Sequence, residues 1–167
     1  MPDQTKPMSQ IAKMLHASRP RIEQNIARNY FREPLFTEPG KAREWTLSEV
    51  VRLAMFLHLM DDVGLPAKDA GELTASPLHG FKDDRAMFVA YKTHAGQMHW
   101  QSEIVRASDL GDFLKNGCEI VHVLQAGHDA ETLRRNSEKL KTSAYVAIIV
   151  DLDAVADKVT KAWNSTK

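Results

Sequence analysis

The sequence predicts an α+β protein in which a helical N-terminal part precedes a smaller part of mixed strands and helices. Its hydrophobic residues repeat with a helical period of about 3.6 up to Thr74, and from about Met87 with the strand period of about two. A connector with proline, glycine and two adjacent aspartates, residues 75–84, separates the two patterns. We therefore expect a first domain over residues 1–74, a linker over 75–84 and a small α/β domain with a mixed sheet over 85–167.

The composition is that of a globular chain without a disulfide framework. Of 167 residues, 43% are hydrophobic, and 22 Lys and Arg balance 22 Asp and Glu, so the formal net charge is zero. The single cysteine, Cys118, excludes an intramolecular disulfide and a multi-cysteine metal site. No apolar stretch approaches the roughly 20 residues that span a bilayer, and the N-terminus lacks the pattern of a secretory signal. We expect a cytoplasmic protein with no membrane segment.

The zero net charge hides an asymmetry along the chain. Residues 1–46 hold eight basic and five acidic side chains, a balance of +3, so the rest of the chain carries −3. A basic end is typical of a protein with an anionic partner, although an excess of three charges also arises by chance. The neutral total therefore does not exclude a nucleic-acid partner.

Two short helices open the first domain. Ser9 is the expected cap of a helix that ends at Leu15, and Ser18 is the expected cap of a second helix over residues 19–31 with Pro20 in its first turn. The break between the two has the length of the turn in a helix-turn-helix. The expected buried face of the second helix consists of Ile22, Ile26 and Tyr30.

A hairpin and two more helices complete the first domain. An extended hairpin is expected over residues 33–46, with Pro39-Gly40 at its turn and Trp45 packed on the helices. A third helix follows, because Thr46–Glu49 has the form of a capping box. A fourth, short helix is expected over residues 66–73.

The second domain is expected to alternate strands and helices. The expected strands are residues 87–91, 98–105, 119–124 and 144–150, and the expected helices are residues 109–115, 129–142 and 152–163. A strand, a helix and a second buried strand suggest a right-handed crossover, so strands 119–124 and 144–150 are expected to be parallel. The apolar stripe of helix 152–163 suits either the core of this domain or self-association.

The exposed face of the second helix carries side chains suited to reading DNA. Arg donates to guanine O6 and N7, and Asn or Gln pairs with adenine N6 and N7. The candidate DNA-binding residues are Arg19, Arg21, Gln24, Asn25, Arg28 and Arg32 from the helix and Lys41 and Arg43 from the hairpin. Glu23 lies among them and is expected to pair with an arginine or to meet a cytosine amino group. The alternative is an amphipathic helix with an ordinary solvated face.

With these elements in this order, residues 8–74 resemble the MerR-like winged helix-turn-helix DNA-binding domains. The resemblance rests on the helix Ile11–Leu15, the helix end Arg28–Tyr30, the wing Gly40–Trp45 and the later helices split by Asp62–Pro66. It implies that the second helix enters the major groove and that the wing contacts the DNA backbone. The sequence departs from the family in the spacing of the wing and in Trp45, where tyrosine is usual. It also lacks the coiled-coil helix and the cysteines of mercury sensors, so metal sensing is not expected.

No catalytic constellation stands out in the second domain, so we expect no enzyme, no cofactor and no metal site. His94 and His99 flank a turn and would hold a metal with Glu103 only if all three converge, and surface histidines are the simpler interpretation. Asp151 follows an apolar strand, where ligand sites of α/β folds lie, but it equally suits the cap of the last helix.

The sequence as a whole predicts a sequence-specific transcription regulator that binds double-stranded DNA as a homodimer. The second domain would supply self-association or respond to an effector that the sequence does not identify. Two other functions stay open. One is a DNA-binding assembly factor of the kind used in phage excision or packaging, and the other is a protein-interaction module whose helix-turn-helix no longer meets DNA.

Overall fold

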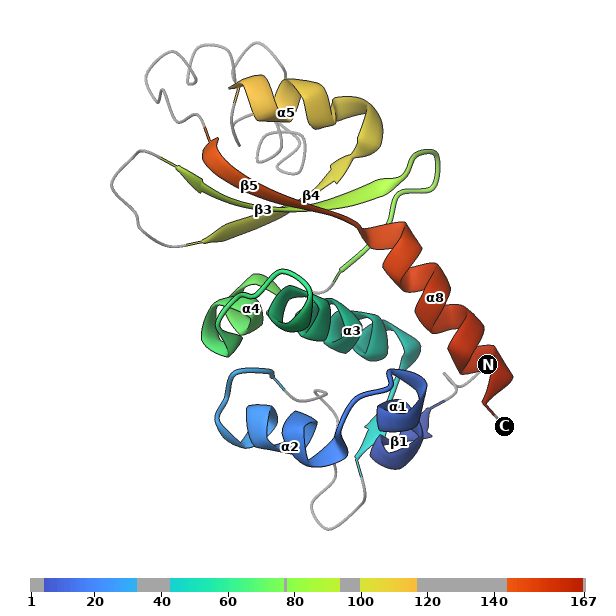
Figure 1. Cartoon of the computed structure of the whole chain (residues 1–167). Coiled ribbons are helices and arrows are strands. Elements are labelled where there is room, and N and C mark those ends of the chain that lie inside the picture. Colours follow the sequence, from blue (N-terminus) through green and yellow to red (C-terminus); the bar gives the residue numbers. More distant parts are fainter. Residues whose placement is uncertain (1–4, 33–42, 77, 94–99, 117–143, 167) are drawn as a thin grey trace. The chain divides into compact units, whose positions relative to one another are not determined.

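The computed structural model describes residues 5–32, 43–76, 78–93, 100–116 and 144–166 (Figure 1). The fold is α+β, as the sequence predicts. The chain divides into two compact units. The first, here the helical unit, combines Met1–Leu78 with Ala154–Lys167, and the second, here the sheet unit, comprises His79–Asp153. The C-terminal helix therefore groups with the first part of the chain, whereas the sequence predicts that it belongs to a domain over residues 85–167.

The helical unit is built around α3, with the other helices packed against it (Figure 1). Its helices are α1 (Met8–Met14), α2 (Arg19–Ala27), α3 (Leu47–Asp61), α4 (Ala67–Leu73) and most of α8 (Leu152–Ser165). The fully buried side chains of α3 are Val50, Leu53, Met55, Phe56 and Leu59. Because these lie on more than one face of the helix, α3 is wrapped by its neighbours rather than packed on one side.

Some of the N-caps of these helices agree with those that the sequence predicts, and others do not. The capping box at α3 is confirmed, since Thr46 Oγ1 accepts from the Glu49 amide at 3.4 Å and the Glu49 carboxylate accepts from the Thr46 amide at 2.8 Å. Ser18 occupies the N-cap of α2, but its side chain makes no capping hydrogen bond. The N-cap of α1 is Pro7 rather than Ser9, so α1 begins two residues earlier than expected.

The helix expected over residues 19–31 is shorter in the structure, because α2 ends at Ala27. Asn29 adopts a left-handed conformation with φ 57°, which turns the chain away from the helix axis. As a result Phe31 is buried, and Tyr30, expected on the inner face, is only half-buried. Helix α4 passes directly against this turn: a Cβ added at Gly71 would lie 1.6 Å from the Tyr30 carbonyl oxygen.

A two-residue pairing that the sequence does not reveal joins the start of the chain to the end of the expected hairpin. Strand β1 (Lys6–Pro7) pairs antiparallel with β2 (Glu44–Trp45). Trp45 is fully buried, as expected, and stacks on Phe31 with ring centroids 6.1 Å apart. The rest of the expected hairpin 33–46, including the turn at Pro39-Gly40, lies outside the described residues.

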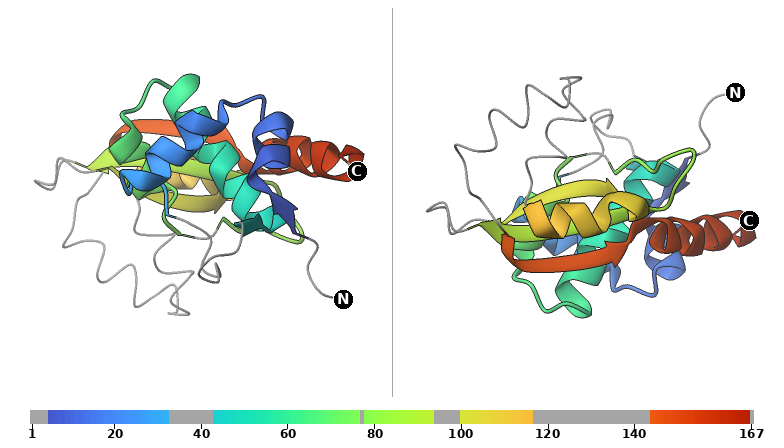
Figure 2. Two further views of the ribbon diagram at one scale, coloured as in Figure 1. Left: turned by 90° about the horizontal axis from the view of Figure 1, so that it is seen from below. Right: turned by 90° about the horizontal axis from the view of Figure 1, so that it is seen from above.

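Helix α8 is held in the helical unit by its apolar stripe and by the N-terminal strand. Val159 and Trp163 are buried, and Lys6 Nζ lies 5.1 Å from the centroid of the Trp163 ring. Lys6 also donates to the Thr166 carbonyl oxygen. Figure 2 shows α8 beside α1, and a hollow of about 450 Å³ is lined by residues of α1, α3 and α8. These contacts account for the grouping of the C-terminal helix with the first part of the chain.

The sheet unit contains a three-stranded sheet with the strand order β4-β3-β5. Its strands are β3 (Ala86–Thr93), β4 (Gln101–Arg106) and β5 (Ala144–Asp151). A 3₁₀ turn, η1 (Ala107–Asp109), leads into α5 (Leu110–Asn116), which covers one face of the sheet (Figures 1 and 2). Phe113 of α5 packs there against Val89, Tyr91 and Val105.

The described strands are all antiparallel, and the mixed sheet that the sequence predicts depends on a further strand that the structure does not describe. Strand β5 pairs with β3, with Met87 opposite Asp151 and Tyr91 opposite Ala147. Strand β3 suits the central position because consecutive residues, Phe88 to Tyr91, are buried on both faces. The expected strand 119–124 and helix 129–142, and with them the expected parallel pairing, lie outside the described residues.

Within the ranges that the structure describes, no helix combines the length and the apolar character that a membrane crossing requires.

Candidate nucleic-acid interface

The inner face of α2 is fixed by packing, which leaves its outer face to solvent. Ile22 and Ile26 are 1% and 3% exposed. The connection from α1 is a tight turn in which His16 has a φ of 50° and the Ala17 amide donates to the Ala12 carbonyl oxygen at 2.9 Å. The predicted pair of short helices with a tight turn is therefore present. The candidate DNA-binding residues on the exposed side of α2 and just after it are Arg19, Arg21, Gln24, Arg28 and Arg32.

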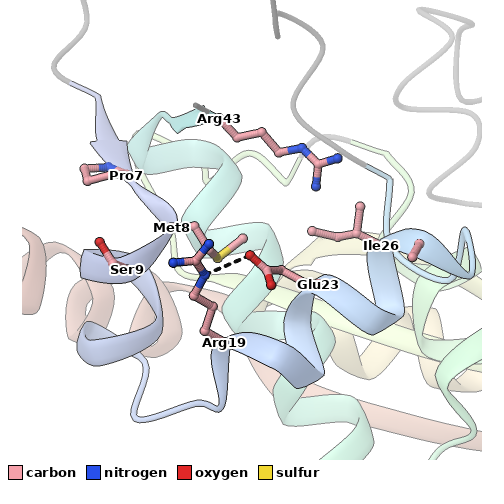
Figure 3. A pocket seen from close by; sticks show the side chains of 8 residues that line it. Pro7, Met8, Ser9, Arg19, Glu23, Ile26 and Arg43 are labelled. Atoms are coloured by element: carbon pink, nitrogen blue, oxygen red, sulfur yellow. Dashed lines mark hydrogen bonds and ion pairs between the residues drawn. The ribbon is translucent and has the colours of Figure 1, made fainter. Parts of the chain in front are cut away.

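A first hollow of about 580 Å³ runs along α2 from Arg19 at its N-terminal end to Ala27, between that helix, the start of α1 and Arg43. Met8 and Ile26 give it apolar walls, while Arg19, Glu23 and Arg43 supply charge (Figure 3). Arg19 Nε donates to Glu23 Oε1 at 2.8 Å, one helical turn away. Glu23 thus takes one of its two expected roles, the pairing with an arginine. The hollow brings together a helix residue and a hairpin residue that the sequence separates by more than twenty positions.

A second hollow, of about 510 Å³, lies at the other end of α2. Arg28 and Arg32 line it from the α2 end, and Lys68 and Glu72 line it from α4, with Lys68 Nζ 3.9 Å from Glu72 Oε1. Arg28 and Arg32 are exposed, and neither has an acidic partner in the described part of the chain. Sequence reasoning missed Lys68, because only the packing of α4 on the end of α2 brings it near Arg28.

The backbone of the second hollow is held from inside the helical unit. Arg52 of α3 donates from Nη2 to the Arg32 carbonyl oxygen at 2.7 Å and from Nη1 to the Ala75 carbonyl oxygen at 3.4 Å. Its guanidinium carbon lies 4.8 Å from the centroid of the Phe31 ring. Burial lowers the pKa of Arg52 from its usual value. With the close approach of Gly71 to Tyr30, these contacts fix the segment that carries Arg28 and Arg32.

The structure removes Asn25 from the predicted reading face. Only 8% of Asn25 is exposed, and its side-chain amide donates to the Arg21 carbonyl oxygen at 3.0 Å. An asparagine that bonds the carbonyl four residues back on its own helix is satisfied locally and does not present its amide to a partner. Asn25 is therefore a structural residue of α2.

Arg21 is exposed but engaged. Its guanidinium bonds both carboxylate oxygens of Asp61 at the end of α3, at 3.0 Å from Nη1 and with a shorter contact from Nη2. The hydrogen bond to Asp61 raises the pKa of Arg21. Arg21 would have to leave Asp61 before its two Nη groups could together bond the edge of a guanine. Of the remaining candidates, Gln24 is exposed and Lys41 lies outside the described residues.

The sheet unit offers no comparable site within the residues that the structure describes. No group of three or more His, Cys, Asp or Glu converges in these ranges, and His94 and His99 fall outside them. Asp151, a candidate ligand position or helix cap, forms an ion pair with Arg85. Asp153 accepts from the Ala86 amide at 2.8 Å. Both contacts lie within the sheet unit, where they hold the start of β3 against the end of β5 and against Asp153.

Along α2 the two hollows adjoin, since Ala27 lines the first and Arg28 lines the second. Their charged lining consists of five basic side chains, Arg19, Arg28, Arg32, Arg43 and Lys68, and two acidic ones, Glu23 and Glu72. A comparison with models of protein families and with curated proteins finds no match to this chain. The function therefore has to be inferred from the chemistry of this basic surface.

Proposed function

We propose that the chain is a sequence-specific transcription regulator that binds double-stranded DNA through α2. The observation that carries the proposal is the basic surface along α2, to which three separate stretches of the chain contribute. Basic side chains near DNA displace counterions from the phosphates, and this release supplies much of the affinity. Regulation follows from occupancy of a promoter site.

The two ends of α2 suit two kinds of contact. In a helix-turn-helix the N-terminal residues of the recognition helix meet the base edges. Arg19 and Glu23, which line the first hollow, lie in the first two turns of α2. The second hollow, with Arg28, Arg32 and Lys68, offers cations of the type that phosphates attract. Base reading is thus assigned to the first hollow and backbone anchoring to the second.

Selection from a randomised duplex library with the full chain, followed by mapping of bound sites in cells, tests the proposal. We expect one recurrent sequence near promoters, bound with a dissociation constant of about 10⁻⁸ to 10⁻¹¹ M. A palindromic consensus with half-sites about one helical turn apart would support action as a homodimer. Recovery of no sequence above the starting library would contradict the proposal, and enrichment at recombination or packaging sites would favour an assembly factor.

Two observations favour a second candidate, a protein-interaction module. The burial of Asn25 and the pairing of Arg21 with Asp61 leave fewer side chains available for base reading than the sequence predicts. A module of this kind would bind its protein partner with little dependence on salt and would not be retained by DNA.

A further inference from the structure

The Arg19–Glu23 pair in the first hollow leaves hydrogen-bonding groups available on both residues. Arg19 is the first residue of α2, and Glu23 follows one turn later. The side chains are 57% and 44% exposed, and the bond at 2.8 Å uses only Nε of Arg19 and Oε1 of Glu23. Within the described ranges, neither the two Nη groups of Arg19 nor Oε2 of Glu23 has a partner. The pair is therefore already ordered and still presents donors beside an acceptor (Figure 3).

We propose that Arg19 and Glu23 act as one unit that selects a G·C base pair in the major groove, an inference that rests on the proposed function. Guanine presents the acceptors O6 and N7, and its partner cytosine presents the N4 amino donor beside them. The two Nη groups of Arg19 match the guanine acceptors, and Oε2 of Glu23 matches the cytosine amino group. The side-chain pair and the base pair thus have complementary orders of donors and acceptors.

Other base pairs meet the unit unfavourably. Adenine places its N6 amino donor toward the donors of Arg19, and thymine places its O4 acceptor toward the Glu23 carboxylate. A reversed base pair presents cytosine to Arg19 and guanine O6 to Glu23, so the same conflicts arise. Discrimination comes from these conflicts as well as from the favourable contacts.

The internal charge balance of the unit separates its role from that of the second hollow. Arg19 and Glu23 together carry no net charge, so they add little to the general attraction for phosphates. A carboxylate near DNA is repelled by the backbone unless a donor such as the cytosine amino group faces it. Glu23 therefore lowers affinity for incorrect sites, whereas Arg28 and Arg32 raise affinity for all sites.

The test uses the full chain and duplexes that carry each of the four base pairs at every position of the selected site. For the wild type we expect G·C at one position to be preferred by on the order of 10-fold or more. Glu23→Ala should reduce this preference, because only the Arg19 contacts to guanine remain, without weakening binding to the other three duplexes. Glu23→Gln should shift the preference toward adenine, and Arg19→Lys should reduce the preference for guanine, since lysine cannot bond O6 and N7 with a planar fork. Arg28→Ala is the matched control and should weaken binding to all four duplexes by a similar factor.

Two outcomes overturn the inference and differ in what else they affect. If the wild type selects a sequence and Glu23→Ala and Arg19→Lys keep the same preference at every position, the pair does not read a base, and the proposed function stands. If the wild type retains no DNA, the inference and the proposed function fail together. Because both side chains are exposed, we expect the thermal unfolding midpoint of each variant to equal that of the wild type. An equal midpoint shows that a changed base preference does not result from a loss of stability.

Discussion

The two ends of α2 carry similar side chains in opposite electrostatic arrangements. At the N-terminal end Arg19 is paired with Glu23 on the same helix. At the C-terminal end Arg28 and Arg32 have no acidic partner in the described part of the chain, and the same hollow also holds the Lys68–Glu72 pair of α4. An ion pair has little net electrostatic field at long range, but its remaining donors and acceptors point in fixed directions. Unpaired charges attract any anion at longer range. The difference assigns discrimination to one end and attraction to the other.

The two ends also differ in how the backbone is supported. The N-terminal end is a regular helix with Pro20 in its first turn. The C-terminal end is an irregular turn that includes Asn29 at positive φ, and it is held by Arg52 and by the backbone of α4. The position of the unpaired charges therefore depends on distant parts of the helical unit, and substitutions there should affect the two ends unequally.

The largest effect is expected for Gly71→Ala. A Cβ at this position would lie 1.6 Å from the Tyr30 carbonyl oxygen, so α4 or the turn after α2 must move. We expect a loss of about 3 kcal/mol in the free energy of unfolding, measured by denaturant titration. Gly111→Ala in α5 is the matched control, because an added Cβ there has no neighbour within 4 Å among the described residues. That variant should keep its stability or gain up to about 1 kcal/mol, and equal losses in both variants would contradict the close packing of α4.

An intermediate effect is expected for Arg52→Met, which keeps the apolar stem and removes the bonds to the carbonyl oxygens of Arg32 and Ala75. Hydrogen bonds from a charged donor contribute about 1.5 to 3 kcal/mol to stability. The substitution also removes the buried Arg52 Nε, which has no hydrogen-bond partner among the described residues, and this offsets part of the lost stability. We therefore expect a loss of about 2 kcal/mol in the free energy of unfolding and weaker DNA binding. Arg52→Lys, which keeps the charge, should retain part of the stability and part of the DNA affinity that Arg52→Met loses. An unchanged unfolding curve for Arg52→Met would show that the turn after α2 does not depend on Arg52.

The smallest effect on stability is expected at the Arg21–Asp61 pair. Both side chains are exposed by more than two-fifths, so breaking the pair by Asp61→Ala should cost about 0.5 kcal/mol of unfolding free energy. The same change frees Arg21 for DNA, and we expect affinity to rise about two- to fivefold in a band-shift titration. Arg21→Ala should cost a similar stability without the gain in affinity. Weaker DNA binding by Asp61→Ala would contradict the competition between Asp61 and DNA for Arg21.

The sequence predicted those elements whose signals are local. The capping box Thr46–Glu49 and the burial of Ile22, Ile26 and Trp45 follow from residue type and short spacings, and the structure has all of them. Features set by distant partners were missed. Strand β1 is two residues long and exists because Glu44 and Trp45 lie beside it, so no periodicity marks it.

The site was predicted in part for the same reason. Helical spacing placed Arg19, Gln24 and Arg28 on the exposed side of α2, where they lie. It also placed Asn25 there, because spacing alone does not reveal that its amide bonds the Arg21 carbonyl oxygen. The early end of α2 accompanies the close approach of Gly71 to the Tyr30 carbonyl oxygen, 41 positions apart in the chain, which only the assembled fold supplies.

The salt dependence of DNA binding by the full chain tests the division between the two ends of α2 most directly. The logarithm of the binding constant falls with the logarithm of salt concentration by about 0.9 for each phosphate neutralised. We expect the slope of the Arg28→Ala/Arg32→Ala double variant to be smaller than that of the wild type by about two, and the slope of Glu23→Ala to be no smaller. Equal slopes for the double variant and the wild type, or no salt-sensitive retention of DNA by the wild type, would contradict a phosphate-binding role for the C-terminal end of α2.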